Sequence, residues 1–225
     1  MEELLNKVRI EVNDKIYLKD PESSELGRKI INGSLALIDE VGFEGFTFKK
    51  LGGKISSPEA SIYRYFESKH KLLLYITSWY WGWMEYKVVL NTANIESPTE
   101  RLLISIQLLT ENIVADSGRN VIDTELLHRI VVTESSKAYL TKLVDDENRE
   151  GVFMSYKSIV ARVSDMILEI NPDYRYPHML VSTVIEGAHH QRFFAEHLPR
   201  LTDVVSGEDA ITSFYQKMVL NTVSA

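Results

Sequence analysis

Apolar residues recur at helical spacing along most of the chain, and the alternation typical of β-strands is nearly absent. Between Asp20 and Val41 they return every three or four positions, and Asp20-Pro21 has the composition of a helix start. The pattern therefore predicts an all-α fold. Beyond residue 67, helices are expected over roughly 68–90, 98–115, 121–132, 135–144, 145–170, 176–197 and from Ser206 onward.

The first twenty residues depart from this pattern. Residues 8–12 alternate between apolar and polar, and Asn13-Asp14 is a candidate two-residue turn. The segment 1–20 can therefore be a short hairpin or an arm, and both interpretations stay open.

Two short helices joined by a tight turn are predicted between Thr47 and Lys69. Thr47 is the expected N-cap of the first helix, and Ser57 and Pro58 are the expected cap and first residue of the second. The turn falls at Ser56-Ser57. This arrangement is a helix-turn-helix, which places its second helix in a DNA major groove.

The second helix has few apolar anchors. Ile62 and Phe66 are expected to point to the core, which leaves Glu59, Tyr63 and Arg64 on other faces. A helix that reads a DNA groove needs this division between packed and exposed residues.

Charge adds a local contrast to this pattern. The 225 residues carry a net charge of −7, which argues against general coating of nucleic acid. Between Gly45 and Lys71, however, six basic and two acidic residues give +4, so the remainder carries −11. A local basic patch is typical of a DNA-binding module, and a solvated charged face is the alternative.

The rest of the composition limits the cellular compartment and the structural class of the protein. With 44% hydrophobic residues the chain is of the globular type, and no apolar run approaches the ~20 residues that cross a bilayer. Export is not expected, because Glu2 and Glu3 open a sequence without a signal pattern. The absence of cysteine excludes disulfides and agrees with the cytoplasm as the predicted location.

From about Leu26 to Leu74, roughly a fifth of the chain, the sequence resembles the TetR family of bacterial transcriptional regulators. Gly52, Ser56, Ser57 and Glu59 depart from the residues common in the family at their positions, which puts the details of base reading in doubt. The resemblance rests on a glycine after the first helix, a threonine at the second, an aromatic-rich recognition helix and a following lysine: Gly42, Thr47, Leu51, Ile62, Tyr63, Arg64, Tyr65, Phe66 and Lys69.

The resemblance implies an all-α protein with a three-helix DNA-binding head and a larger helical domain for ligand binding and dimerisation. We expect an arm over 1–20, the head over 21–68 and the second domain over 69–225. It also implies which residues touch DNA, with Lys49 added from the basic segment. The expected phosphate contacts are Thr47, Tyr63, Tyr65 and Lys69, and the residues near bases are Ser57, Pro58, Ala60 and Arg64.

A homodimer on a palindromic operator and a small-molecule effector are the further implications. A ligand would tilt the fourth helix and weaken operator binding. Repression is the expected outcome because a dimer on a promoter blocks polymerase. The ligand-wall candidates are Trp79, Trp83, Phe153, Tyr156, His189 and Phe193. The dimer candidates are Leu180, Val184, Gly187, Ala188, Leu198, Ile211, Phe214 and Met218. Packing within the monomer core is the competing interpretation for both sets, and for Tyr63 and Tyr65.

Two other functions are compatible with parts of the sequence. Glu125-x-x-His128 and Glu186-x-x-His189 have the spacing used by di-metal carboxylate helical bundles, but further ligands are not evident. A helical protein-binding module without DNA binding is the second rival. No P-loop, dinucleotide fingerprint or nucleophile elbow occurs, so neither a cofactor nor an enzymatic activity is expected.

Overall fold

The computed structural model describes residues 10–113 and 122–224, and these residues contain helices and no strand. Packing divides the chain into two compact units. The first contains Met1–Tyr80 and Ile113–Met154, and the second contains Trp81–Asn112 and Ser155–Ala225. These units reflect which residues pack together and do not test a division by function. The functional boundary expected near residue 68 therefore stays a prediction.

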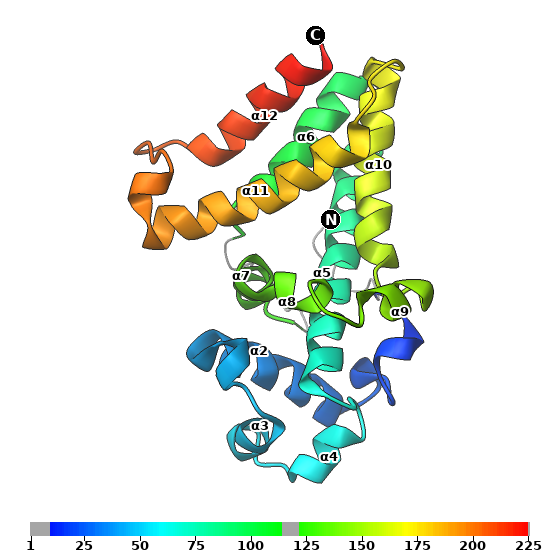
Figure 1. Cartoon of the computed structure of the whole chain (residues 1–225), viewed down its shortest axis with the longest axis vertical. Helices are drawn as coiled ribbons and strands as arrows, with labels where there is room; N and C mark the ends of the chain where they lie inside the picture. The colour runs from blue at the N-terminus through cyan, green and yellow to red at the C-terminus, as the bar shows by residue number, and fades with distance from the viewer. Residues whose placement is uncertain (1–9, 114–121, 225) are drawn as a thin grey trace. The chain divides into compact units, whose positions relative to one another are not determined.

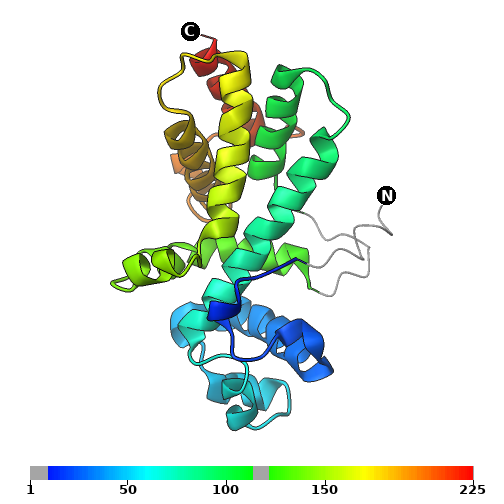
Figure 2. The ribbon, with the colours of Figure 1, turned by 90° about the vertical axis from the view of Figure 1, so that its right-hand side faces the viewer.

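The first unit opens with a short N-terminal segment, residues 10–23. It forms two 3-10 helices, η1 (Asp14–Ile16) and η2 (Pro21–Ser23), and runs along the first part of α5 in Figure 2. The described part of this segment has no strand, so the hairpin alternative is not realised there.

Asp20 does not start the long helix that the sequence predicted. Its side chain accepts a hydrogen bond from the Glu22 amide and caps η2, because the proline that follows favours a tight local turn. Ser24 caps α2 (Glu25–Gly45) instead, by accepting a hydrogen bond from the Gly27 amide.

Three helices then form the head of this unit: α2, α3 (Phe48–Lys54) and α4 (Glu59–Tyr63). Figure 1 shows them side by side at the lower end of the view. Their core consists of apolar side chains that are fully buried, which fits the helical spacing read from the sequence. These are Ile30, Leu35, Phe46, Leu51, Ile62 and Phe66.

The same unit includes elements that lie far along the chain. The first part of α5 (Lys69–Thr92) is joined by α7 (Thr124–Glu134), α8 (Ser136–Tyr139) and α9 (Val144–Arg149). The expected single helix over 145–170 is interrupted, because Gly151 adopts a φ of 79° that ends α9 and precedes α10.

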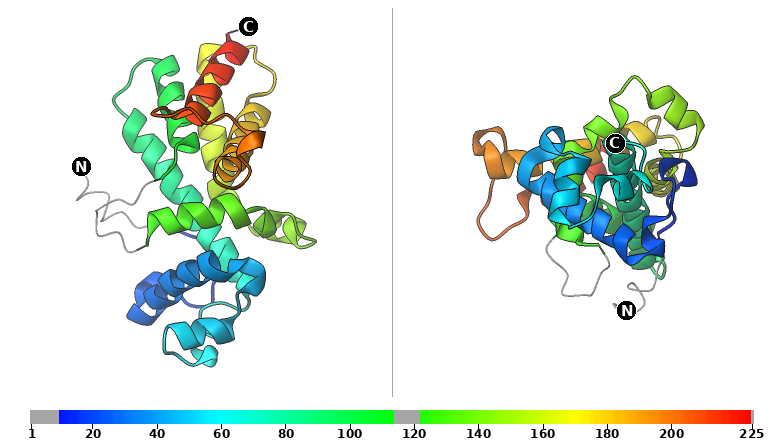
Figure 3. Two further views of the ribbon diagram at one scale, coloured as in Figure 1. Left: turned by 90° about the vertical axis from the view of Figure 1, so that its left-hand side faces the viewer. Right: turned by 90° about the horizontal axis from the view of Figure 1, so that it is seen from below.

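The second unit contains the end of α5, α6 (Pro98–Thr110), α10 (Met154–Ile170), α11 (Pro177–His197), η3 (Pro199–Leu201) and α12 (Ala210–Val223). In Figures 1 and 3, α12 packs on α6 and α11. Across the described parts of the chain, none of the helices combines the length and apolarity needed to span a bilayer.

Candidate functional site

The start of α3 is fixed by a threonine cap. The Thr47 hydroxyl accepts a hydrogen bond from the Lys50 amide at 3.2 Å, as the sequence predicted. The Lys50 ammonium donates to the Gly45 carbonyl at 2.7 Å, which ties α3 to the end of α2. Thr47 and Lys49 are exposed, so both can reach a partner outside the chain.

The turn between the two short helices depends on a close backbone approach at Gly52. A Cβ at this position would lie 2.6 Å from the Ser57 carbonyl oxygen, so a larger residue would push α3 and α4 apart. The Ser57 amide donates to the Gly52 carbonyl at 2.9 Å. Ser56 has a φ of 53°, which a non-glycine residue adopts at a cost.

The expected cap of α4 by Ser57 is wrong. Pro58 occupies the N-cap position and no side chain bonds to the first amides of the helix. Ser57 is half-buried and its amide closes the turn by donating to the Gly52 carbonyl, so the helix begins one residue later than expected, at Glu59.

The second short helix, α4, exposes the side chains that the sequence placed on its outer face. Ile62 is fully buried, whereas Pro58, Ala60, Tyr63 and Arg64 are exposed. The Tyr63 ring is 47% exposed and meets the Phe48 ring edge-on with centroids 5.0 Å apart. This contact places the end of α4 beside the start of α3, so exposed residues of both helices border one face of the head.

Tyr65 and Lys69 are engaged within the protein. Tyr65 is only 3% exposed, and its hydroxyl forms a 2.8 Å hydrogen bond with the Ser24 hydroxyl. The Ser24 hydroxyl is the main cause that lowers the pKa of the Tyr65 phenol. The Lys69 ammonium donates to the Phe43 carbonyl at 3.0 Å and lies over the Phe43 ring. Their predicted phosphate contacts stay predictions, and burial speaks against the one at Tyr65.

The cations of the head differ in availability. Lys54 is paired with Glu40 at 2.9 Å, so much of its charge is neutralised locally. Within the described residues, Lys49 and Arg64 form no ion pair and both are exposed. These two side chains are therefore the best placed to meet phosphates or base edges.

In the second unit, two of the predicted ligand-wall residues meet at a tryptophan that the sequence did not single out. The Trp81 ring stacks on Tyr156 with centroids 4.3 Å apart and on His189 at 5.9 Å. The Tyr156 hydroxyl donates to the Glu186 carboxylate at 2.9 Å. Burial lowers the pKa of His189 to about 4, so the imidazole is neutral at pH 7.

The other four ligand candidates have contacts of a different kind. Trp79 and Phe153 belong to the first unit, where the Trp79 indole donates to the Glu22 carboxylate at 2.8 Å. In the second unit the Trp83 ring lies under the Lys87 ammonium, and Phe193 contacts the ring of His197. Helical spacing gave all six residues the same appearance, because it does not report which unit each one packs in.

The predicted dimer residues divide between buried and exposed positions. Val184, Ala188 and Ile211 are buried by their own unit. Leu198 and Phe214 are exposed, by 47% and 58% of their surface. Gly187, Leu180 and Met218 are half-buried. Large apolar residues that the sequence reading did not select are exposed as well: Met179, Leu201, Val204 and Val205.

The two Glu-x-x-His pairs are used in other ways. Glu125 bonds to Arg129 at 2.8 Å, and the Tyr80 hydroxyl is 3.0 Å from the His128 Nδ1. Within residues 10–113 and 122–224, no group of three or more histidine or carboxylate side chains is arranged to hold a metal ion. The arrangement therefore gives no support to a di-metal site.

Two contacts between α7 and α2 were also not predicted from the sequence. Arg129 makes a two-pronged ion pair with Asp39, at 3.0 and 3.1 Å. The Glu134 carboxylate, 8% exposed, accepts a hydrogen bond from the Phe43 amide at 3.0 Å. No sequence signal identifies such pairs, because their members are about ninety positions apart.

Comparison with known proteins agrees with this geometry. Residues 30–76 match the model of a family described as bacterial regulatory proteins, tetR family. No curated protein matches the chain.

Among solved structures, AibR in complex with isovaleryl coenzyme A and operator DNA is 17% identical, with a TM-score of 0.57 over 85% of this chain and 96% of that one. The superantigen PfiT is 15% identical, with a TM-score of 0.57 over 90% and 97%. A putative fatty acid metabolism regulator of Clostridium perfringens is 14% identical, with a TM-score of 0.50 over 87% and 97%. Likeness at this level concerns the fold, and the different descriptions of these proteins show that the fold does not decide function.

Proposed function

Because residues 30–76 place the chain in the tetR family of bacterial regulatory proteins, we propose that it is a repressor that binds a palindromic operator as a homodimer and is released by a small molecule. The observation that carries this proposal is the exposed face of the head. Lys49 and Arg64 are accessible there, while Ile62 is fully buried and anchors α4.

The chemistry of this face fits a division between positioning and reading. Thr47, Lys49 and Tyr63 are exposed and offer hydroxyls and an ammonium, which are groups that bind phosphate oxygens. Arg64 can bond guanine through two parallel hydrogen bonds in the major groove. Pro58 and Ala60 are small enough to let α4 approach the bases closely.

A homodimer follows from the size of this module, since α4 has only five residues and can read few base pairs. Two heads one helical turn apart, about 34–36 Å, would read a palindrome. The exposed Phe214 on α12 and Leu198 after α11 supply apolar surface for self-association.

The effector site is proposed in the second unit, around Trp81, Tyr156 and His189. The Trp81 and Tyr156 rings, stacked at an interplanar angle of 13°, supply aromatic groups, and Glu186 and the neutral His189 imidazole supply polar groups beside them. Isovaleryl coenzyme A, bound in the AibR complex, is the first compound to test.

The signal would reach the head along elements that contact α2. The Arg129–Asp39 ion pair and the Glu134–Phe43 hydrogen bond fasten α7 to α2 in the first unit. A ligand that favours another position of α7 or α5 would therefore reorient α2 and with it α4, which is a shift between two populations of the protein.

The decisive experiment is a gel shift of the full chain on DNA from upstream of its own gene. We expect sequence-specific binding whose affinity falls steeply between 50 and 200 mM salt, by roughly 10³-fold or more if six phosphates are contacted. Repeating the titration with isovaleryl coenzyme A tests release. Equal binding to promoter and random DNA would contradict the proposal.

A further inference from the structure

A pocket lies within the first unit, between the N-terminal segment and α5. Its volume is about 320 Å³, at the lower end of the range of small-molecule sites. Apart from Tyr75 on α5, every described lining residue comes from residues 10–22. None of them belongs to the exposed face of the head or to the stack around Trp81, so the proposed function leaves this pocket without a role.

The lining is strongly one-sided in charge. Among the residues that the structure describes, the lining combines four carboxylates with two phenols and two aliphatic side chains and includes no lysine or arginine. Such a wall creates a negative potential that repels anions and attracts cations. The carboxylates belong to Glu11, Asp14, Asp20 and Glu22, the phenols to Tyr17 and Tyr75, and the aliphatic groups to Ile10 and Val12.

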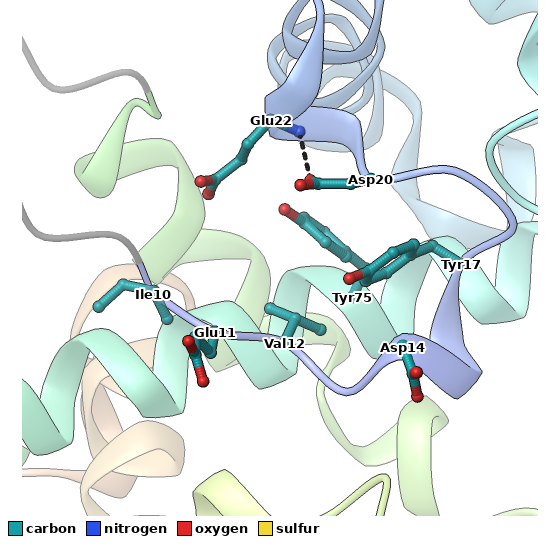
Figure 4. Close-up of a pocket in the computed structure, with 8 residues that line it drawn as sticks. All are labelled: Ile10, Glu11, Val12, Asp14, Tyr17, Asp20, Glu22 and Tyr75. Carbon is teal, nitrogen blue, oxygen red and sulfur yellow. Dashed lines mark hydrogen bonds between the residues drawn. The ribbon is translucent and has the colours of Figure 1, made fainter.

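Figure 4 shows how these groups are distributed. The carboxylates of Asp20 and Glu22 lie near the Tyr75 hydroxyl on one side, and Ile10 and Val12 lie on the other. Trp79 donates a 2.8 Å hydrogen bond to one Glu22 oxygen, which orients that carboxylate. A carboxylate has about four acceptor sites, so Glu22 can bond a ligand as well.

The same lining distinguishes between classes of cation. In the described residues no three carboxylate or histidine side chains converge as metal ligands, so the acids of this wall are spread too widely for an ion held by the protein alone. The aliphatic side chains and the Tyr17 ring suit an apolar body, and the acids suit a charged head that donates hydrogen bonds. We propose that this pocket binds a small primary ammonium ion with a short apolar tail.

The pocket is joined to the head at Tyr65, directly after α4. The Leu18 amide donates to the Tyr65 carbonyl at 2.8 Å, and the Ser24 hydroxyl bonds to the Tyr65 hydroxyl at 2.8 Å. Along the chain, Leu18 and Ser24 lie on either side of Asp20 and Glu22. A ligand that orders this segment would therefore change the DNA affinity of the head, a consequence that rests on the proposed function.

Calorimetric titration of the full chain with n-pentylammonium tests the site, with 1-pentanol and pentanoate as neutral and anionic counterparts. We expect binding of the ammonium ion alone. Glu22→Gln should weaken it by roughly tenfold, because it removes the charge while its amide oxygen still accepts from Trp79. Asp145→Asn is the matched control, since Asp145 is an exposed carboxylate of the same unit outside the pocket.

Three results would overturn the site: no heat with the ammonium ion, equal binding of 1-pentanol, or an equal loss with Asp145→Asn. A gel shift with and without n-pentylammonium tests the coupling to the head. If calorimetry shows binding but the DNA affinity is unchanged, the proposed coupling to the head is wrong and the proposed site still stands. Failure of the chain to bind promoter DNA at all would instead contradict the proposed function.

Discussion

Arg64 and Tyr65 are neighbours with opposite surroundings. The arginine follows the last turn of α4 and is exposed, whereas the tyrosine is 3% exposed and bonded to Ser24. The sequence reading gave both a contact with DNA, and the structure brings only the first to the surface. The difference arises because the chain turns after α4 and directs Tyr65 toward the start of α2.

Replacing Arg64 by alanine should weaken operator binding by about 1–3 kcal/mol, or roughly 5- to 150-fold, because a bidentate base contact would be lost. A gel shift at fixed salt measures the change. Lys142→Ala is the control, since Lys142 is an exposed cation of the same unit far along the chain. An equal loss in both variants would mean that Arg64 contributes only general charge.

Ser56 offers a test of backbone strain in the turn, because its φ of 53° is costly for a side chain with a Cβ. Ser56→Val should lower the free energy of unfolding by about 1–2 kcal/mol, since a β-branched residue tolerates this conformation poorly. Ser56→Gly should be no less stable than the parent. Urea denaturation followed by circular dichroism measures both, and equal stability of the valine variant would argue against the left-handed turn.

In the second unit, the Tyr215 side chain of α12 packs directly against Gly187 of α11. A Cβ on Gly187 would lie 2.3 Å from the Tyr215 hydroxyl oxygen, and Tyr215 is 5% exposed. Small residues at such crossings allow two helices to approach, and the unit depends on this approach because α12 packs on both α6 and α11.

Gly187→Ala is therefore expected to cost about 1–3 kcal/mol of stability through overpacking. Combining it with Tyr215→Phe should recover part of the loss, since the hydroxyl is the atom in conflict. Gly53→Ala is the matched control: nothing lies within 4 Å of its Cβ, so helix propensity should raise stability slightly. Thermal unfolding of Gly187→Ala, Tyr215→Phe, the double variant and Gly53→Ala measures the cycle, and a stable Gly187→Ala would argue against this close packing.

At the scale of the whole molecule, self-association should depend on apolar surface left exposed by each chain. Phe214→Asp is expected to convert a dimer into monomers, because a charge on a residue that is 58% exposed disrupts an apolar interface by about 2 kcal/mol or more. Leu140→Asp is the control, at an apolar residue of the first unit that is 78% exposed. Sedimentation at several protein concentrations measures the molecular mass of each variant. An unchanged dimer mass for Phe214→Asp would show that the interface lies elsewhere.

The stability of the fold should also fall at acid pH through His189. Burial lowers the pKa of this imidazole from 6.5 to about 4, so the unfolded chain binds a proton that the folded chain excludes in this window. The stability is therefore present above pH 6.5 and declines as pH falls toward 4, by about 3 kcal/mol.

His189→Phe should flatten the decline between pH 6.5 and 4, because it keeps a ring beside Trp81 and removes the titration. His178→Gln, at an exposed histidine, should leave the decline unchanged. Thermal unfolding across this pH range makes the comparison. If the stability of His189→Phe falls with pH as steeply as that of the parent, a group other than His189 causes the decline.

The sequence alone determined the helical class, the helix-turn-helix and its Thr47 cap, because helical spacing, caps and turn residues act over a few neighbouring positions. The break at Gly151 and the start of α2 at Ser24 show the limit of this reasoning even for local features. The start at Ser24 was missed because Asp20-Pro21 also has the composition of a helix start. The break at Gly151 depends on a positive φ at a single glycine, which helical spacing does not report.

Only the tertiary structure decided which aromatic and acidic side chains share a site. It brought Trp81, Tyr156 and His189 together in one stack, gave the Trp79 indole a hydrogen bond to Glu22, and placed Glu22 beside Tyr75 in a pocket. Pairings such as Arg129 with Asp39 depend on how distant helices pack, and periodicity along the chain carries no record of that packing.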